Sequence, residues 1–225
     1  MLARILFLSL ILVFSSARAE EEQPQPGDNL MGENDITAEE LLVARDDDFV
    51  IGDKSAPITI IEYASLTCPH CASFHNNTYD DLKEKYIDTG KVNFIFRSFP
   101  LDEASLRASM MATCAGEEKY GKFLKVLFST QSNWSQKKNY LEVLANIGKL
   151  GGMPSSDFDL CIADKDLEHK IMQDKFYALK QLEVRSTPTF FINGVMHKGS
   201  RDLEYFTTEI EKILNPEAEE KAKTE

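Results

Sequence analysis

The feature that most constrains this chain is the pair Cys68 and Cys71, spaced as C-x-x-C with Pro69 and His70 between them. An apolar, β-branched run at residues 58–63 precedes the pair, and apolar residues at helical spacing follow it. This order places Cys68 at the start of a helix, where free N–H groups and the helix dipole favour a thiolate. Cys71 lies one turn further, within disulfide reach, and Pro69 is tolerated because the first helical position needs no N–H. The segment therefore predicts two thiols that exchange between the reduced and the disulfide-bonded state.

Two other interpretations of the pair stay open. The first is a zinc site built from Cys68, Cys71, His70 and His75. A structural zinc site needs four well-spaced ligands, and no second C-x-x-C or matching histidine pair follows in the sequence. The second is a purely structural disulfide, although so short a loop gains little from chain entropy and is easily strained. The sequence favours redox chemistry over both, and we expect no metal.

Residues 1–19 predict a secretory signal peptide. Arg4 gives the positive start, residues 5–14 give the apolar core, and residues 17–19 form an A-x-A cleavage site. The alternative is a membrane anchor, but the apolar run is short for a bilayer span. Cleavage after Ala19 would release a soluble chain into an oxidising compartment, where a C-x-x-C cycles as a thiol oxidant instead of staying reduced.

Charge and cysteine count narrow the classes further. The chain has 25 Lys and Arg against 37 Asp and Glu, which gives a net charge of −12 and argues against binding to nucleic acid or anionic lipid. Four cysteines in an exported chain favour two pairs, so if Cys68 pairs with Cys71, then Cys114 and Cys161 remain. A bridge between these two would close a loop of about 47 residues and contribute about 4 kcal/mol in the chain-entropy model. Two buried free thiols are the alternative.

Residues 20–51 predict a flexible leader, because the segment is acidic and rich in Pro and Gly up to residue 34. One short helix is expected at residues 36–44, with Thr37 as N-cap and Glu40 three residues on. The aspartates at residues 46–48 predict a solvated turn, because the spacing of an EF-hand loop is absent.

The remaining pattern predicts an α/β fold on one mixed sheet. A strand at residues 58–63, a helix at 69–88 and a strand at 91–99 form a βαβ unit, which joins parallel strands. Val92, Phe94 and Phe96 alternate along the second of these strands and share one face. Residues 102–182 show helical periodicity throughout and predict several helices inserted between two strands.

The last part of the chain predicts a hairpin and a closing helix. Two short β runs at residues 189–192 and 195–198 are joined by Asn193-Gly194, a pairing typical of a tight turn. The hairpin adds antiparallel strands to the sheet. A helix at residues 202–214 follows, with Phe206 and Ile210 inward, and residues 215–225 predict a frayed, charged tail.

These motifs together resemble the DsbA family of exported thiol:disulfide oxidoreductases. The matching features are Cys-Pro-His-Cys after Glu62-Tyr63-Ala64-Ser65-Leu66-Thr67, the helical insertion, and the run from Ser186 through Thr187-Pro188 to Gly194. The match covers roughly residues 52–213. Phe99-Pro100-Leu101 and the pair Cys114 and Cys161 resemble the branch with a second cysteine pair. The resemblance implies a thioredoxin-like fold in two parts, residues 52–101 and 183–214, with a helical domain at 102–182 inserted between them.

The resemblance also implies roles for the motif residues. Cys68 would be the attacking cysteine and Cys71 the buried, resolving one. His70, between the cysteines, can donate a hydrogen bond or hold a positive charge, which favours a Cys68 thiolate. The alternative for His70 is an exposed loop histidine without redox effect. Cys114 and Cys161, which have no C-x-x-C context, are expected to form a structural disulfide.

Two further site residues depend on the resemblance. Thr187-Pro188 resembles the cis-proline loop of the family, which would face Cys68 and present backbone to an extended substrate; the alternative is a trans proline that starts a strand. Glu62 lies in an otherwise apolar strand, and the family implies a buried acid beneath the cysteines that assists proton transfer at Cys71. The alternative is an outward-facing strand residue. Arg97 is the expected counter-ion of Glu62.

The sequence therefore predicts an enzyme that introduces disulfide bonds into exported proteins in the periplasm, with no cofactor beyond the Cys68–Cys71 disulfide. The expected partners are reduced exported polypeptides and, by resemblance alone, a DsbB-type membrane re-oxidant. A disulfide isomerase or reductase on the same fold remains an alternative, as does a binding module with a structural disulfide. A monomer is expected, because no room precedes Ile58 for a dimerisation domain.

Overall fold

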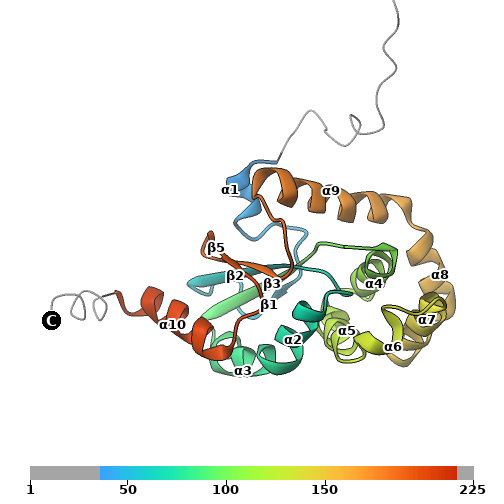
Figure 1. Cartoon of the computed structure of the whole chain (residues 1–225), viewed down its shortest axis with the longest axis horizontal. Coiled ribbons are helices and arrows are strands. Elements are labelled where there is room, and N and C mark those ends of the chain that lie inside the picture. Colours follow the sequence, from blue (N-terminus) through green and yellow to red (C-terminus); the bar gives the residue numbers. More distant parts are fainter. Residues whose placement is uncertain (1–35, 217–225) are drawn as a thin grey trace, which may run out of the picture. The chain divides into compact units, whose positions relative to one another are not determined.

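The structure, a computed structural model, describes residues 36–216. The predicted signal peptide, the first part of the leader and the end of the charged tail lie outside the described residues. The described part is built on a five-stranded sheet in the order β1-β3-β2-β4-β5 (Figure 1). The strands are β1 (Val50–Ile51), β2 (Ile58–Ala64), β3 (Val92–Ser98), β4 (Thr189–Ile192) and β5 (Val195–Lys198).

The pairing of the strands confirms the predicted mixed sheet. β2 runs parallel to β3, while β4 is antiparallel to β2 and β5 is antiparallel to β4. β1 adds a two-residue antiparallel partner to β3. This strand was not predicted, because two residues are too few to show alternation.

The helices cover both faces of the sheet and fill the segment between β3 and β4. They are α1 (Ala38–Leu41), α2 (Pro69–Asn77), α3 (Tyr79–Leu82), the π-helix η2 (Lys83–Ile87), α4 (Glu103–Cys114), α5 (Glu117–Ser129), α6 (Gln131–Trp134), α7 (Tyr140–Leu150), α8 (Ser155–Ala163), α9 (Lys165–Gln181) and α10 (Leu203–Leu214). The helix expected at residues 69–88 is divided into three pieces: Thr78 leaves the helical backbone at φ −128° and ψ −38° between α2 and α3, and the π-helix η2 continues from α3 without a break in the helical backbone. The capping box of Thr37 and Glu40 on α1 is confirmed.

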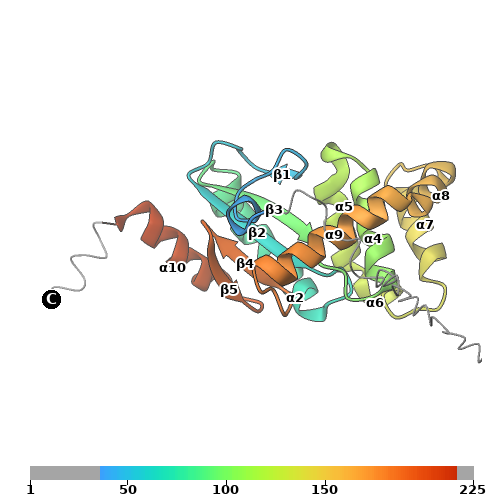
Figure 2. The same cartoon turned by 90° about the horizontal axis from the view of Figure 1, so that it is seen from above.

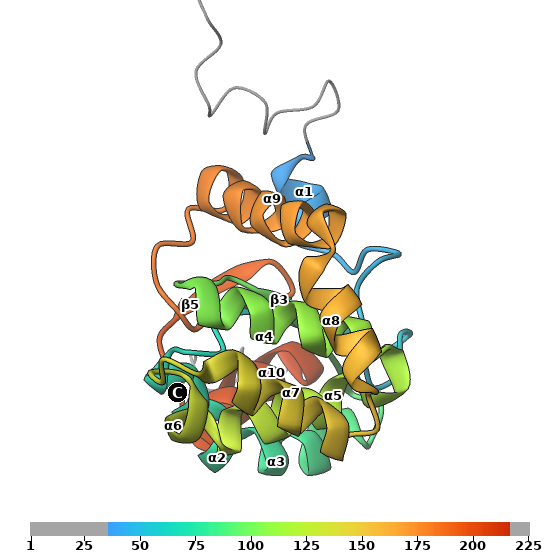
Figure 3. The ribbon, with the colours of Figure 1, turned by 90° about the vertical axis from the view of Figure 1, so that its right-hand side faces the viewer.

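Alternation along β2 divides the core between two faces of the sheet. Ile58 and Ile60 belong to the larger core, together with residues of α2, α5 and α10. Ile61 and Tyr63 belong to a smaller core on the other face, together with residues of α1 and α9. The ribbon shows the same layers, with α1 and α9 on one side of the sheet and α2, α3 and α10 on the other (Figures 1 and 3).

The segment between β3 and β4 contains six helices, α4 to α9, and they do not form one body. α4 packs against α5, α7 and α8, and α5 also packs against the sheet through the contacts of Tyr120 and Phe128 with Phe96 of β3. α9 instead runs across the face of the sheet and contributes Tyr177 and Ala178 to the smaller core (Figure 2). Part of the predicted insertion therefore covers the sheet itself.

The hairpin turn is hydrogen-bonded to the start of β2 through a side chain, in addition to the main-chain hydrogen bonds that join β4 to β2. Asn193 and Gly194 have φ of 44° and 83°, the positive values that a two-residue type I′ turn requires. The Asn193 side chain accepts a hydrogen bond from the N–H of Thr59 at 2.8 Å and donates to the carbonyl oxygen of Pro57 at 3.3 Å. The turn is therefore joined to the start of β2, which fixes the register of the segment that begins with Pro188.

Two sequence-based expectations around Arg97 are wrong. Arg97 pairs with Tyr63 across the ladder, whereas Glu62 pairs with Phe96, so alternation puts Arg97 and Glu62 on opposite faces. The guanidinium of Arg97 donates to both carboxylate oxygens of Asp48, at 3.0 and 2.6 Å. It also donates to the carbonyl oxygens of Leu41 and Val43. Asp48 is therefore a buried counter-ion, not part of a solvated turn, because it neutralises an arginine on a central strand.

Candidate active site

The cysteine pair lies where β2 gives way to α2. Cys68 is the N-cap of α2, in extended backbone at φ −77° and ψ 121°, and Pro69 is the first helical residue. The N–H of Cys68 donates to the carbonyl oxygen of Ser65 at 3.1 Å, which closes a tight turn. The hydroxyl of Thr67 donates to the carboxylate of Asp102, the N-cap of α4, at 2.8 Å. One hydrogen bond within the turn and one to the start of α4 therefore fix the backbone that leads into Cys68.

The two thiols are free in the structure and differ in their protonation. The pKa of Cys68 is lowered to about 5, chiefly by the hydrogen bond from the Cys71 thiol, then by Thr187 and by the main-chain N–H groups of Cys71 and His70, against the opposing effect of burial. The pKa of Cys71 is raised, first by burial, then by the shared hydrogen bond to Cys68 and the charge of Glu62. At neutral pH, Cys68 is therefore a thiolate and Cys71 a thiol.

His70 acts through its backbone in this geometry. Its side chain is exposed, and within residues 36–216 the imidazole makes no hydrogen bond. The His70 N–H, which is one of the unsatisfied donors at the start of α2, contributes to the lowered pKa of Cys68. The contribution of the His70 N–H comes from the helix terminus, and the role predicted for the His70 imidazole stays a prediction.

The segment before β4 approaches Cys68 from the opposite direction. The Thr187-Pro188 peptide bond is cis, and the Sγ of Cys68 lies 3.4 Å from the carbonyl oxygen of Thr187. Thr187 is half-buried and Pro188 is buried. The antiparallel pairing of β4 with β2 brings residues 119 positions apart to the same end of the sheet.

Glu62 lies on the α2 face of β2 and is completely buried. Its Oε2 is hydrogen-bonded to the Nε2 of His75 at 2.7 Å, and its Oε1 has no hydrogen-bond partner among residues 36–216. His75 was considered only as a zinc ligand in the sequence. The imidazole is directed at Glu62, and within residues 36–216 no group of three or more His, Cys, Asp or Glu is arranged to hold a metal ion.

Sequence reasoning missed Gln131 altogether. This residue begins α6, and its buried side-chain amide donates to the carbonyl oxygens of Leu66 and Cys68, at 2.8 and 3.0 Å. It holds the backbone that leads into the cysteine motif. No local pattern marks it, because the contact joins residues more than sixty positions apart.

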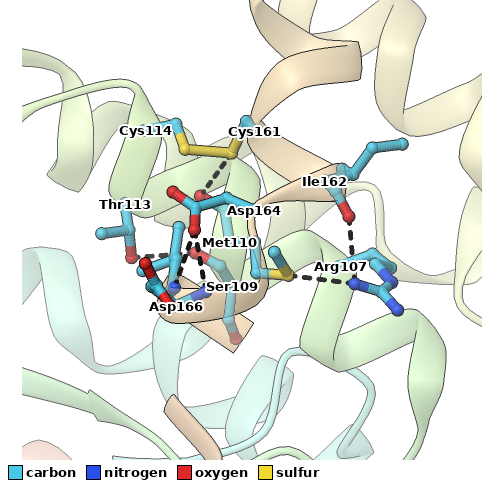
Figure 4. The surroundings of a disulfide bond; sticks show 10 residues. Arg107, Ser109, Met110, Thr113, Cys114, Cys161, Ile162, Asp164 and Asp166 are labelled. Carbon is cyan, nitrogen blue, oxygen red and sulfur yellow. Dashed lines mark hydrogen bonds between the residues drawn. A yellow bond between two sulfur atoms is a disulfide. The ribbon is translucent and has the colours of Figure 1, made fainter. Parts of the chain in front are cut away.

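The second cysteine pair is a disulfide that joins the end of α4 to α8 (Figure 4). Cys114 is exposed, whereas Cys161 is buried with its Sγ 3.2 Å from the carbonyl oxygen of Met110. Arg107 lies nearby and donates to the carbonyl oxygen of Ile162 at 3.1 Å, a second link between the same two helices. Both cysteines line a surface hollow of about 400 Å³.

No helix among residues 36–216 has the length and apolar character to cross a membrane. The fold and the site together define a thioredoxin-fold protein with a dithiol at the start of its first long helix. Comparison with known proteins narrows this class. Residues 44–212 match the family model described as thioredoxin.

Among solved structures, alpha-DsbA1 of Wolbachia pipientis is 42% identical, with a TM-score of 0.75, and the match covers 79% of this chain and 96% of that one. The alpha-DsbA2 of the same organism is 27% identical, with a TM-score of 0.60, over 73% of this chain and 86% of that one. A protein of Rickettsia felis named putative protein-disulfide oxidoreductase is 33% identical over 80% of this chain, and the match spans 64% of the length of that relative. The chain therefore belongs to the DsbA family of thioredoxin-fold proteins, which confirms the predicted family and fold class.

Proposed function

We propose that this protein is a thiol:disulfide oxidoreductase that introduces disulfide bonds into exported polypeptides through Cys68 and Cys71. The observation that supports this most directly is the opposite change in the two thiol pKa values, with that of Cys68 lowered to about 5 and that of Cys71 raised. The names of the related proteins from Rickettsia and Wolbachia agree with this class of activity.

The reaction starts from the Cys68–Cys71 disulfide. A substrate thiolate attacks the Sγ of Cys68, the bond between the two enzyme sulfurs breaks, and Cys71 takes up its electron pair and a proton. A second thiolate of the substrate then attacks the mixed disulfide, and Cys68 leaves as a thiolate. The substrate has lost two electrons, and the enzyme dithiol has gained them.

Cys68 is the better leaving group because of its environment. A thiol with a lowered pKa is displaced faster, and a stabilised thiolate favours the reduced enzyme, which makes the disulfide a stronger oxidant. DsbA itself is an established case of this effect, and only the direction of the effect is carried over to this chain. The oxidising direction follows from the stabilised Cys68 thiolate.

The resolving role assigned to Cys71 applies to only one direction. If Cys71 attacks the mixed disulfide, the Cys68–Cys71 bond re-forms and the substrate leaves reduced. Net oxidation therefore needs the second substrate thiolate to react before Cys71 does. The high pKa of Cys71 slows the competing attack, because only its thiolate is nucleophilic.

The segment at Thr187 gives the substrate a place to bind. Its carbonyl oxygen is 3.4 Å from the Sγ of Cys68. A substrate in extended conformation can donate its backbone N–H to such an oxygen, as in strand addition. Recognition through the backbone suits an enzyme that must accept many sequences.

Completion of the cycle needs an acceptor for the two electrons. We assign this role to a DsbB-type membrane re-oxidant that accepts electrons from Cys68 and Cys71 of a monomeric, periplasmic protein. A pulldown of Cys71→Ser protein from membranes, followed by reduction of the captured disulfides, tests this partner.

The main experiment measures the redox potential together with the refolding of a reduced substrate that needs several disulfides. We expect a potential well above that of thioredoxin, which is about −270 mV, and rapid formation of disulfides without efficient correction of wrong ones. A potential near that of thioredoxin would instead assign the protein to the reductases. Efficient reshuffling of scrambled substrate would assign it to the isomerases.

A further inference from the structure

Glu62 is a buried carboxylate in apolar surroundings. On the sheet it lies between Phe96 of β3 and Phe190 of β4, and none of its side chain is exposed. Burial of a carboxylate costs several kcal/mol unless a partner compensates for it, and hydrogen bonds to the charged form are the usual compensation. Within residues 36–216 the only hydrogen-bond partner of the Glu62 carboxylate is His75.

The His75 ring is held in one orientation. It stacks on the ring of Phe128 from α5, with centroids 4.1 Å apart and planes 11° from parallel, and the ring of Tyr79 lies 5.0 Å away. This packing points Nε2 at one oxygen of Glu62. The residue is 8% exposed, and its Nδ1 has no hydrogen-bond partner among the described residues. The ring therefore extends from the buried carboxylate towards the surface.

His75 also lies on the Cys71 side of α2. The two residues are four positions apart on one helix and therefore share a face. The charge of Glu62 acts on the buried Cys71 thiol, which places the carboxylate within electrostatic range of the sulfur. The Oε1 of Glu62, which has no hydrogen-bond partner in the described part of the chain, has lone pairs that can accept a proton. Glu62 and His75 are thus hydrogen-bonded to each other, and the charge of Glu62 acts on the buried Cys71 thiol.

We propose that His75 positions the carboxylate of Glu62 for Cys71 and exchanges protons between that carboxylate and water. The step starts from a protonated imidazole hydrogen-bonded to the Glu62 carboxylate. When Cys71 ionises, its proton is relayed through water to the Oε1 of Glu62, with which the thiol makes no direct hydrogen bond among the described residues, and the Nδ1 proton of His75 passes to water. One proton enters the pair and one leaves it, and reversal of the step returns a proton to Cys71. This inference rests on the proposed function, since it concerns the proton that Cys71 gains and loses in each cycle.

Few other titratable groups face this pair. Cys68 and Cys71 lie on the same helix, Tyr79 comes from α3, and Tyr120 comes from α5. Burial and the charge of Glu62 raise the pKa of Tyr79, and burial raises that of Tyr120, so both phenols remain protonated at neutral pH. His75 is therefore the residue whose ring contacts Glu62, and imidazole is the side chain that ordinarily exchanges protons near neutral pH.

The test isolates the ionisation of Cys71 from the chemistry of Cys68. Reduced protein is converted to a mixed disulfide between Cys68 and thionitrobenzoate. Attack by Cys71 then releases the coloured thiolate, and its rate is recorded by stopped flow between about pH 5 and 8, the range in which histidine side chains ordinarily change charge. We expect His75→Gln to slow the release by about a hundredfold, as for loss of a proton-transfer group, and to remove a titration step from the pH profile.

Three comparisons make the result specific. In a Glu62→Gln background, His75→Gln should cause no further slowing, because the two residues act in series. His75→Ala leaves a gap beside Phe128, and imidazole added to the buffer should restore part of the rate. His197→Gln is the matched control, because His197 is also mostly buried and hydrogen-bonded, to the Tyr205 hydroxyl at 2.6 Å, and should release at the wild-type rate.

The outcomes separate this inference from the proposed function. If wild-type protein forms no mixed disulfide at Cys68, or does not release thionitrobenzoate, the proposed function fails. If wild-type protein does both and His75→Gln releases at the same rate with the same pH profile, the role of His75 is wrong and the proposed function stands. Equal slowing by His75→Gln in wild-type and Glu62→Gln backgrounds would also overturn the role, because His75 would then act through packing alone.

Discussion

The two cysteine pairs of this protein differ in where the first cysteine of each pair lies on its helix. Cys68 is the N-cap of α2, whereas Cys114 is the last residue of α4. The start of a helix presents free N–H groups that stabilise a thiolate, and the end presents carbonyl oxygens that destabilise it. The same side chain is therefore reactive in one place and inert in the other. The comparison shows that two local features, the helix start and the Cys71 thiol that donates a hydrogen bond to Cys68, separate the proposed catalytic pair from the other pair.

The pairs also differ in what their bonds would constrain. The Cys114–Cys161 disulfide spans 47 positions and joins α4 to α8, so it restricts a long loop in the unfolded chain. A bond between Cys68 and Cys71 would span three positions and restrict little. The Cys114–Cys161 bond therefore suits stability, while the Cys68–Cys71 bond can form and break at small cost to the fold.

The largest effect should come from replacing the cysteines of the first pair one at a time. We expect Cys68→Ser to abolish thiol exchange, because it removes the sulfur that a substrate thiolate attacks. Cys71→Ser should keep exchange at Cys68 and accumulate mixed disulfides, because no enzyme thiol can displace the substrate. Both are measured by non-reducing electrophoresis after incubation with a reduced substrate. If Cys68→Ser traps substrate as well as Cys71→Ser does, the assigned roles are wrong.

The next effect concerns the dependence of stability on pH in the reduced protein. The pKa of Cys68 falls from its ordinary 9.0 to about 5 on folding. The folded state therefore binds fewer protons than the unfolded chain between these values. The resulting stability is fully present above about pH 9 and is lost as the pH falls through about 5. Cys71, whose pKa is raised, is protonated in both states below about pH 9 and adds no pH dependence there.

This effect is measured as the difference in Tm between reduced and oxidised protein, since the oxidised form has no Cys68 thiolate. We expect the reduced form to lose stability relative to the oxidised form on acidification from about pH 8 to 5. The Cys114–Cys161 pair stays oxidised if reduction is mild, which mass spectrometry of alkylated protein verifies. A difference in Tm that is constant over this range would show that Cys68 gains no stabilised thiolate on folding.

A smaller effect is expected from removal of the second pair. The double variant Cys114→Ala/Cys161→Ala should lose about 2–4 kcal/mol of stability, the usual contribution of a disulfide. Thermal unfolding should show this as a Tm lower by several degrees, while exchange at Cys68 continues. If the folded variant lost all oxidase activity, the second pair would be part of an electron relay and the division between the pairs would collapse.

Sequence reasoning reached the first pair because its determinants are local. Strand, Cys68, Pro69 and helix succeed one another within a few residues, and Asn193-Gly194 marks a hairpin by its own backbone preference. The order of β2, α2 and β3 also determined that the strands are parallel. Local pattern and chain order were therefore sufficient for the sheet, the hairpin and the position of the cysteines.

The missed features depend on contacts between distant segments. The face of Arg97 depends on the register of β3 against β2, which a sequence pattern does not give. The partner of Glu62 is thirteen positions away on another element, and that of Cys68 is Thr187, which only the family resemblance indicated. The π-helix η2 and the division at Thr78 have no signal that we recognise in the sequence.

The smallest expected effect tests whether the two pairs communicate. Gln131 comes from the same inserted helices as the second disulfide and donates to the carbonyl oxygens of Leu66 and Cys68. Gln131→Ala leaves both oxygens without this donor, and we expect a loss of about 1–3 kcal/mol of stability. The turn before Cys68 should also become more mobile, so alkylation of Cys68 should change by less than about tenfold. Gln136→Ala, on the exposed end of the same segment, is the control and should change neither quantity.

If Gln131→Ala in the Cys114→Ala/Cys161→Ala background changes the alkylation rate as it does in wild-type protein, the two pairs are independent. A different change would show that the second disulfide acts on Cys68 through this side chain.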